Sequence, residues 1–284
     1  MVHLSRAAGA AALVLGLCIA LAGHARAAQE RDVRIADVDT VVWTPDAAAA
    51  ARLPVVLFSH GMYMCPAQSR RLTAALADAG YLVIAPLHSD STCSHSMSAD
   101  LSRLGMKPSL FWNDSDYRDR AEDIRKVLEA LPADPVLGPI ADLGEVALMG
   151  HSLGGYTVLG LGGAWPSWRL PGVRAIIALT PYSLPFQRSE GLRHIGVPVM
   201  FQVGALDPVF TLPLESAGYA QTPSPKMLVE IRWANHLAWT DVGFASRDAI
   251  VGHAVAFLDH YVKGSPEAPA LHAALPGVGD FRRD

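Results

Sequence analysis

Short apolar segments alternate along the chain with longer amphipathic ones. The short segments are rich in β-branched residues and bounded by glycine or proline, which is typical of strands buried on both faces. The longer ones repeat apolar residues at helical spacing. One such stripe, ended by Pro132, consists of Ile124, Val127, Leu128 and Leu131. The alternation predicts an α/β protein with a mostly parallel sheet and helices on both faces.

These patterns place most elements after residue 30. Strands are predicted at 55–58, 81–85, 145–149, 174–179, 198–203 and, as the last strand, 227–233. Helices are predicted at 68–79, at 152–162, at 247–261 and from a cap at Ser115 or Asp116 to residue 131. We expect an edge strand or hairpin over 33–43 and a loosely held, Pro- and Ala-rich tail after Gly264.

The first residues follow a different pattern. His3 and Arg6 precede an apolar run over 7–22, and residues 25–27 read Ala-Arg-Ala, a cleavage site of the A-x-A type. This is the layout of a secretory signal peptide, with a retained N-terminal helix as the alternative. The run is shorter than the ~20 residues that span a bilayer, so we expect no stable membrane anchor. We expect export to the periplasm or the exterior and a mature chain from about Ala28.

Composition fits a single domain over residues 28–284. The chain has 284 residues, of which 51% are hydrophobic and 18% charged, enough for one large core. The net charge of −4 is small, and no run of Lys and Arg points to a nucleic-acid partner or a polybasic membrane patch.

One motif carries candidate chemistry. Residues 150–154 read Gly-His-Ser-Leu-Gly, a G-x-S-x-G sequence between a predicted strand and a predicted helix. In that setting the motif is a nucleophile elbow, a turn so tight that only glycine fits beside a strained serine. Ser152 would lie at the carboxyl edge of the sheet, where N–H groups at the start of the helix can stabilise an oxyanion. Ser152 is the candidate nucleophile.

A serine nucleophile needs a base, and the base needs an acid to orient it. Asp207 follows the strand predicted at 198–203, and His236 follows that at 227–233, so both should reach the same sheet edge as Ser152. We expect His236 to act as general base and Asp207 to orient its imidazole. Four alternatives precede a strand, lie in the last helix or suit a loop or helix cap: His194, His253, His260 and Asp241.

The loop after the first core strand is the expected source of a second oxyanion donor. We assign the backbone N–H groups of Met62 and Leu153 as the oxyanion hole. His60 in that loop also fits a plain turn residue bonded to nearby backbone. No metal or cofactor is expected, because the histidine spacing matches no common zinc pattern over His60, His88, His95 and His151.

The motifs together resemble the α/β-hydrolase superfamily. More narrowly, the chain is similar to the bacterial dienelactone-hydrolase-like esterases, which also resemble platelet-activating-factor acetylhydrolases and polyester hydrolases. The resemblance covers about residues 40–262, taken as the catalytic core, and is carried by 54–61, 120–131, 150–155, 203–207 and 235–236. It implies the α/β-hydrolase fold and a serine esterase without a cofactor.

Two departures from these families narrow what the resemblance implies. Dienelactone hydrolases use a cysteine where this chain has Ser152, so their substrate does not carry over. Platelet-activating-factor enzymes place the acid after the strand that follows the nucleophile helix, but residues 178–182 contain no carboxylate. The acid therefore falls to Asp207, as in the polyester hydrolases. Tyr63 and Tyr182 become candidate substrate contacts, with a packed loop aromatic as the alternative for Tyr182.

Two of the three cysteines follow the predicted signal peptide, Cys65 and Cys93. An oxidising compartment favours a disulfide between them, and two buried free thiols are the alternative. In the superfamily's sheet order the strands ending at Phe58 and Ala85 are neighbours. The resemblance therefore implies that a Cys65–Cys93 disulfide braces the rim of the active site.

The connection over residues 88–115 is unusually long. It starts at the predicted catalytic edge and contains Met97, Met106, Phe111 and Trp112. It either covers the substrate pocket as a lid or packs its aromatic side chains on the sheet, and the sequence leaves both open.

These residues predict an exported hydrolase of carboxylic esters that acts through an acyl-enzyme on a small-molecule or lipid ester. Alternatives within the same chemistry are a hydrolase of acetyl-phospholipids or polyesters and a serine peptidase. The alternative from another class is a non-catalytic binding protein that kept the fold, against which the intact Ser–Asp–His set argues.

Overall fold

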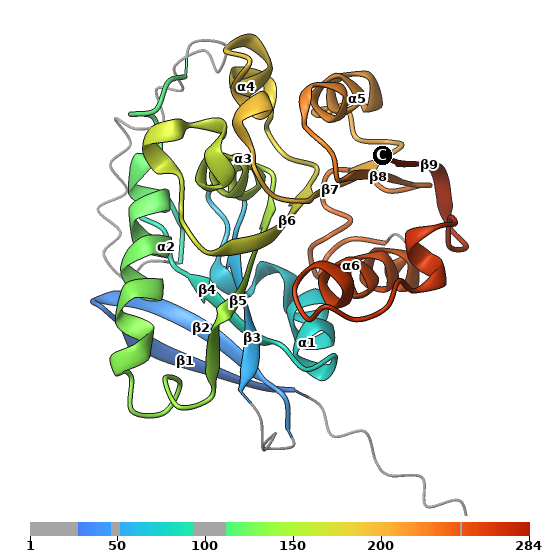
Figure 1. The fold of residues 1–284 in the computed structure, drawn as a ribbon. Helices are drawn as coiled ribbons and strands as arrows, with labels where there is room; N and C mark the ends of the chain where they lie inside the picture. Colours follow the sequence, from blue (N-terminus) through green and yellow to red (C-terminus); the bar gives the residue numbers. More distant parts are fainter. Residues whose placement is uncertain (1–27, 47–51, 94–111, 245) are drawn as a thin grey trace, which may run out of the picture.

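A computed structural model describes residues 28–46, 52–93, 112–244 and 246–284. Within these ranges nine strands form one sheet in the order β1-β2-β4-β3-β5-β6-β7-β8-β9, and helices cover both of its faces (Figure 1). The predicted α/β class is confirmed. No helix within the described ranges is long and apolar enough to cross a membrane. The predictions for the signal peptide and for Met97, Met106 and Phe111 lie outside the described residues.

The described elements have the following bounds. The strands are β1 (Gln29–Ile35), β2 (Val38–Thr44), β3 (Leu53–Ser59), β4 (Leu82–Pro86), β5 (Ala141–His151), β6 (Val173–Leu179), β7 (Val199–Gly204), β8 (Lys226–Ile231) and β9 (Val278–Arg283). The α-helices are α1 (Arg70–Asp78), α2 (Arg118–Ala130), α3 (Leu153–Leu159), α4 (Leu184–Arg188), α5 (Leu212–Gln221) and α6 (Arg247–Tyr261).

The centre of the sheet is parallel and its two edges are antiparallel. All pairings from β4 through β3, β5, β6 and β7 to β8 are parallel, whereas β1, β2 and β9 join the edges antiparallel. Parallel strands are covered on both faces, which explains their continuous apolar sequences. In β3, Val55 and Leu57 enter one core while Val56 and Phe58 enter the other.

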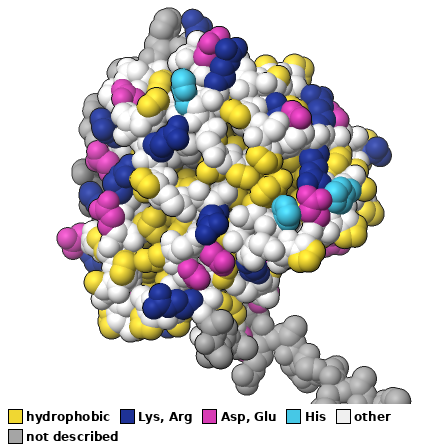
Figure 2. All heavy atoms as spheres, in the orientation of Figure 1, with side chains coloured by type: hydrophobic (Ala, Val, Ile, Leu, Met, Phe, Trp, Pro, Cys, Tyr) yellow, Lys and Arg dark blue, Asp and Glu magenta, His cyan; other side chains and the backbone are white. Residues whose placement is uncertain are grey.

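Two layers of helices complete the fold. Helices α2, α3, α4 and α5 pack on one face, and α1 and α6 on the other (Figure 1). In α2 the predicted stripe faces the core: Ile124 and Val127 are fully buried, as is Leu131 directly after the helix. Acidic and basic side chains are interspersed over the face shown in Figure 2, with no large area of one sign.

Two helix boundaries differ from prediction. Helix α2 begins at Arg118, and its N-cap is Tyr117 in the left-handed conformation with φ of 60°. The prediction of a Ser115 or Asp116 cap is therefore wrong. The Asp116 carboxylate instead accepts the Asn113 N–H at 2.8 Å, which closes the turn before the helix. The helix predicted over 152–162 is regular only as far as the end of α3 and continues as a π-helical turn over Gly160–Ala164.

The C-terminal tail is not loosely held, so that prediction is wrong. It forms β9, which pairs antiparallel with β8 and makes 227–233 the last strand but one. Only Val278 of β9 is buried, so the segment carries almost no apolar alternation that could have indicated a strand. The open edge of β8 supplies the pairing instead. At the other edge, the hairpin expected over 33–43 is present as β1 and β2.

Candidate active site

Ser152 lies in the tight turn that its motif predicts. It joins β5 to α3 with φ of 57° and ψ of −115°, a conformation that costs an L-residue about 1–3 kcal/mol. A Cβ on Gly150 would lie 2.2 Å from the Gly154 carbonyl oxygen, and one on Gly154 would lie 1.9 Å from that of Ser59. Two backbone bonds hold the turn, from Ser152 N–H to Leu179 O at 3.0 Å and from Tyr182 N–H to Ser152 O at 3.1 Å.

The structure brings Ser152, Asp207 and His236 together, although they follow three different strands. Ser152 Oγ lies 3.0 Å from Nε2 of His236, and Nδ1 of His236 lies 2.8 Å from Oδ2 of Asp207. Strands β5, β7 and β8 are parallel members of one sheet, so their carboxyl ends deliver these side chains to the same edge. The geometry suits removal of the serine proton by the imidazole.

Asp207 is held as a buried carboxylate. Its Oδ1 accepts the N–H groups of Val209 and Phe210 at 2.8 and 3.0 Å, and its Oδ2 accepts the hydroxyl of Thr180 as well as His236. Burial by itself raises the pKa of Asp207, but these hydrogen bonds outweigh it and lower the pKa to about 2. The group is therefore charged at neutral pH. The sequence did not predict the hydrogen bond from Thr180 to Asp207, because residues 178–182 were informative only in lacking a carboxylate.

The two assigned oxyanion donors lie next to the elbow. Leu153 follows Ser152 directly and begins α3. Met62 lies in the loop after β3. The carbonyl of Ser59, the last residue of β3, abuts Gly154, so this loop begins directly beside the elbow. In the described part of the chain neither N–H has a hydrogen-bond acceptor. Both donors are thus available to a negatively charged oxygen beside Ser152.

Gln68 and His151 connect the three loops of the site, a role that sequence reasoning missed. Oε1 of Gln68 accepts the Gly61 N–H at 2.8 Å, and its Nε2 donates to Nδ1 of His151 at 3.1 Å. Nε2 of His151 donates in turn to the carbonyl of His236 at 2.8 Å. Burial lowers the pKa of His151 to about 3, so the ring is neutral and can accept at one nitrogen while donating at the other.

The structure joins Cys65 to Cys93 in a disulfide, with 5.6 Å between their Cα atoms. The bond links the loop after β3 to the segment after β4, as the resemblance implied. Tyr63 lies in the same loop, half-buried and with φ of 59°. Tyr63 directly follows the assigned oxyanion donor Met62 in the chain.

Tyr182 belongs to an aromatic cluster beside the candidate base. Its ring centroid lies 4.8 Å from that of Trp112 and 5.3 Å from that of Phe210, and Phe210 lies 5.0 Å from His236. Tyr182 is thus a packed aromatic at the edge of the site. Trp112, near the C-terminal end of the long connection, is buried in this cluster.

The alternative residues lie away from Ser152 or serve other contacts. His194 ends a 3-10 turn before β7, and the two histidines of α6 bond backbone carbonyls, His253 that of Ala270 and His260 that of Ser265. Asp241 accepts the Arg71 N–H at 3.1 Å, so it does cap a helix, namely α1. Among the described residues, which omit His95, no group of three or more His, Cys, Asp or Glu side chains could hold a metal ion.

Neither a scan against protein-family models nor a search of curated proteins finds a match to this chain. The functional interpretation of the site therefore rests on its geometry.

Proposed function

We propose that this protein is a serine hydrolase of the α/β-hydrolase fold that cleaves carboxylic esters through an acyl-enzyme on Ser152. The observation that carries the proposal is the series of two hydrogen bonds, 3.0 Å from Ser152 to His236 and 2.8 Å from His236 to Asp207. The order of serine, acid and histidine along the chain and the strand–elbow–helix setting of Ser152 support this fold.

In the first half of the reaction, His236 takes the proton of Ser152 as Oγ attacks the ester carbonyl carbon. The carbonyl oxygen becomes negatively charged and accepts the N–H groups of Met62 and Leu153. Asp207 stabilises the imidazolium that forms. His236 then gives its proton to the leaving alcohol, and the acyl group stays on Oγ.

In the second half, His236 removes a proton from a water molecule that attacks the acyl carbon. The same two N–H groups stabilise the second oxyanion. Collapse of the tetrahedral intermediate releases the carboxylic acid and returns the proton to Ser152, so the enzyme is regenerated without any cofactor.

Exposed apolar side chains beside the acid and the base favour an apolar ester. Leu206 and Val209 flank Asp207 with 53% and 57% of their surface exposed, and Trp233 precedes His236 with 78% exposed. Large apolar groups exposed around a site are typical of surfaces that contact apolar ligands. They support the alternative of a lipid or polyester substrate. The Cys65–Cys93 disulfide supports export to an oxidising compartment.

A fluorophosphonate probe tests the proposal directly. The wild-type protein should be labelled, and Ser152→Ala should lose the label along with at least ~10³-fold of its turnover of a chromogenic short-chain ester. Ser167→Ala, at an exposed serine after α3, is the matched control and should behave as wild type. An unlabelled wild-type protein would indicate a non-catalytic binding protein, and activity retained in Ser152→Ala would remove Ser152 from the mechanism.

A substrate series resolves the ester class. Esters of increasing acyl length, an acetyl-phospholipid, a polyester film and an amide should be compared at equal enzyme concentration. The apolar side chains predict that kcat/KM rises with acyl length and that the amide, which tests the peptidase alternative, is hydrolysed slowest. A preference for the shortest ester would contradict the apolar assignment.

A further inference from the structure

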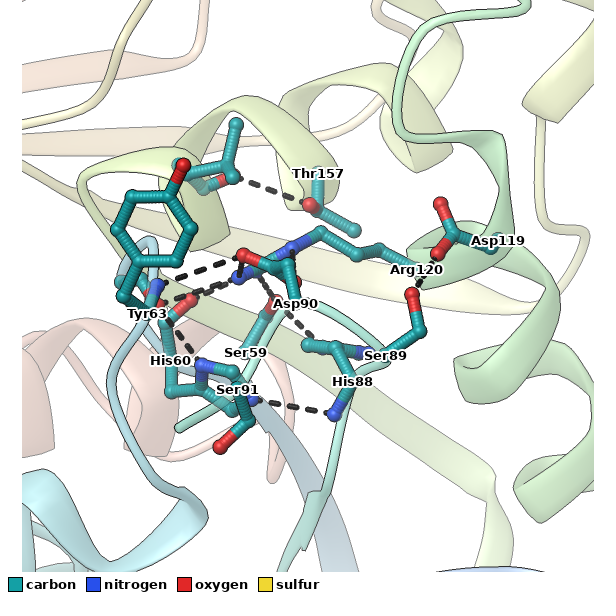
Figure 3. Close-up of polar contacts among 12 residues, drawn as sticks. Ser59, His60, Tyr63, His88, Ser89, Asp90, Ser91, Asp119, Arg120 and Thr157 are labelled. Carbon is teal, nitrogen blue, oxygen red and sulfur yellow. Dashed lines mark hydrogen bonds and ion pairs between the residues drawn. The ribbon is translucent and has the colours of Figure 1, made fainter. Parts of the chain in front are cut away.

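Arg120 is fully buried beneath the loop that carries Met62. Figure 3 shows its guanidinium between Asp90 and the backbone of His60. Nη1 donates to the carbonyl of His60 at 2.7 Å, and Nη2 donates to that of Gly61 at 3.1 Å. A buried guanidinium is unfavourable unless it is fully paired, so these contacts decide where the backbone before Met62 can lie.

Asp90 holds Arg120 from the other side and also reaches past Met62. It pairs with the guanidinium through two bonds of 2.9 Å, from Nε to Oδ1 and from Nη2 to Oδ2. Oδ2 also accepts the N–H of Tyr63 at 3.4 Å. Burial raises the pKa of Asp90, but Arg120, with smaller contributions from His60 and His88, brings it below its ordinary value, so the carboxylate is charged. Residues 60, 61 and 63 are thus fixed by one ion pair, with the Met62 N–H between them.

A second Ser–His–Asp series contacts Arg120 through its serine. Ser59 Oγ lies 2.9 Å from Nε2 of His88, and Nδ1 of His88 lies 3.0 Å from Oδ2 of Asp123. Ser59 and His88 are fully buried, so this serine cannot reach a substrate as a nucleophile.

The direction of these bonds is set by Arg120. Its Nη1 donates to Ser59 Oγ at 3.4 Å, which leaves the hydroxyl proton for Nε2 of His88. His88 then donates from Nδ1 to Asp123. Burial and the charge of Arg120 hold the pKa of His88 well below its usual value, which keeps the ring neutral as this pattern requires.

We propose that Arg120, paired with Asp90, is a positioning residue that aims the Met62 N–H at the oxyanion. The proposal rests on the esterase function proposed above. It explains why an arginine is present, because only its planar fork of donors can bind two carbonyls and both carboxylate oxygens together. A lysine would keep the charge but could not make the same set of bonds.

Arg120→Lys and Arg125→Lys form a matched pair in α2. Among the described residues, the Arg125 guanidinium makes one hydrogen bond, to the carbonyl of Trp168 at 3.0 Å, on a segment apart from the Met62 loop. Arg120→Lys should lower kcat by about 10- to 100-fold with KM within about threefold of wild type. A displaced Met62 N–H stabilises the oxyanion of the transition state less well, whereas it contributes little to binding of the uncharged substrate. Affinity for a trifluoromethyl ketone, which forms an oxyanion adduct on the serine, should fall by the same factor as kcat/KM. Arg125→Lys should leave both unchanged.

Other outcomes overturn the proposal. A folded Arg120→Lys protein with wild-type kcat and ketone affinity, or with only KM raised, would show that Arg120 does not position an oxyanion donor. Should Arg120→Lys fail to fold, Asp90→Asn keeps the shape of the pair and tests the same loop. It should lower kcat and ketone affinity together, and unchanged values would overturn the proposal. Failure of the esterase function is distinct, since the wild-type protein itself would then not react with the fluorophosphonate.

Discussion

At the scale of single residues, two members of the candidate site are held in states that they would not adopt alone. Ser152 has a backbone conformation that is rare for an L-residue, and Asp207 is a charged carboxylate away from water. Neighbouring groups compensate: backbone bonds secure the turn, and Thr180 and two N–H groups satisfy the carboxylate. The geometry of the candidate site therefore depends on bonds from residues outside the Ser152, His236 and Asp207 set.

The low pKa of Asp207 makes stability depend on pH. Its pKa of about 2 lies below the ordinary value of 3.8, so its ionisation stabilises the fold above the ordinary value, and that stabilisation is lost as pH falls through about 2. The stabilisation amounts to about 2 kcal/mol. We expect wild type to exceed Asp207→Asn in free energy of unfolding by a margin that shrinks between pH 6 and pH 2, measured by urea denaturation. A margin that stays constant over that range would contradict the assignment.

At the scale of elements, the parallel strands carry the site and the antiparallel edges protect it. Ser152, Asp207 and His236 each come within a few residues after the end of a parallel strand, namely β5, β7 and β8. Strand β9 covers the open side of β8, with Ile231 paired to Val278 and Met227 to Arg283. The strand that precedes His236 is therefore an inner strand of the sheet, although it was predicted to be the last strand of the chain.

Removing β9 should destabilise the protein. Truncation after Gly277 leaves the N–H and C=O groups of β8 that face β9 without partners, which lowers the melting temperature and promotes aggregation through the free edge. Thermal unfolding and light scattering measure both effects. Arg282→Ala is the control, because within the described residues its side chain hydrogen-bonds Asp280 of the same strand, and the strand remains. Truncated protein that melts at the wild-type temperature would show that β9 contributes nothing to the sheet.

At the scale of the whole molecule, the loops at the catalytic edge are cross-linked in three ways. The Cys65–Cys93 disulfide connects the loop after β3 to the segment after β4. Asp90 and Arg120 join the same two segments to α2 through their ion pair and their bonds to the loop backbone, and Gln68 connects the loop to the elbow. The sheet supplies the direction of each loop, and these links fix the loops relative to one another.

Reduction of the disulfide should lower the free energy of unfolding by about 3 kcal/mol, because the unfolded chain regains the freedom of the loop that the bond closes. Thermal unfolding with and without reductant measures the change. A Cys65→Ser, Cys93→Ser double variant should melt at the lower temperature in both conditions. A wild-type melting temperature that does not respond to reductant would contradict a structural role for the bond.

The sequence by itself determined the features that arise from short segments. Alternating apolar strands and amphipathic helices predicted the α/β class, because burial on two faces requires that pattern. The elbow was predicted because only glycine fits at residues 150 and 154. The positions of Asp207 and His236 after predicted strands placed both at the edge of Ser152, because the carboxyl ends of parallel strands share one edge of a sheet.

Only the tertiary structure decided which buried polar groups meet. Arg120 pairs with a carboxylate 30 residues earlier, and Gln68 bonds a histidine 83 residues later. An arginine in a helix has the same sequence signature whether it faces solvent or a loop carbonyl. Likewise β9 forms because a neighbouring strand offers an unpaired edge, and its own residues show almost no strand pattern. Such contacts depend on the packing of distant segments, and so local patterns could not predict them.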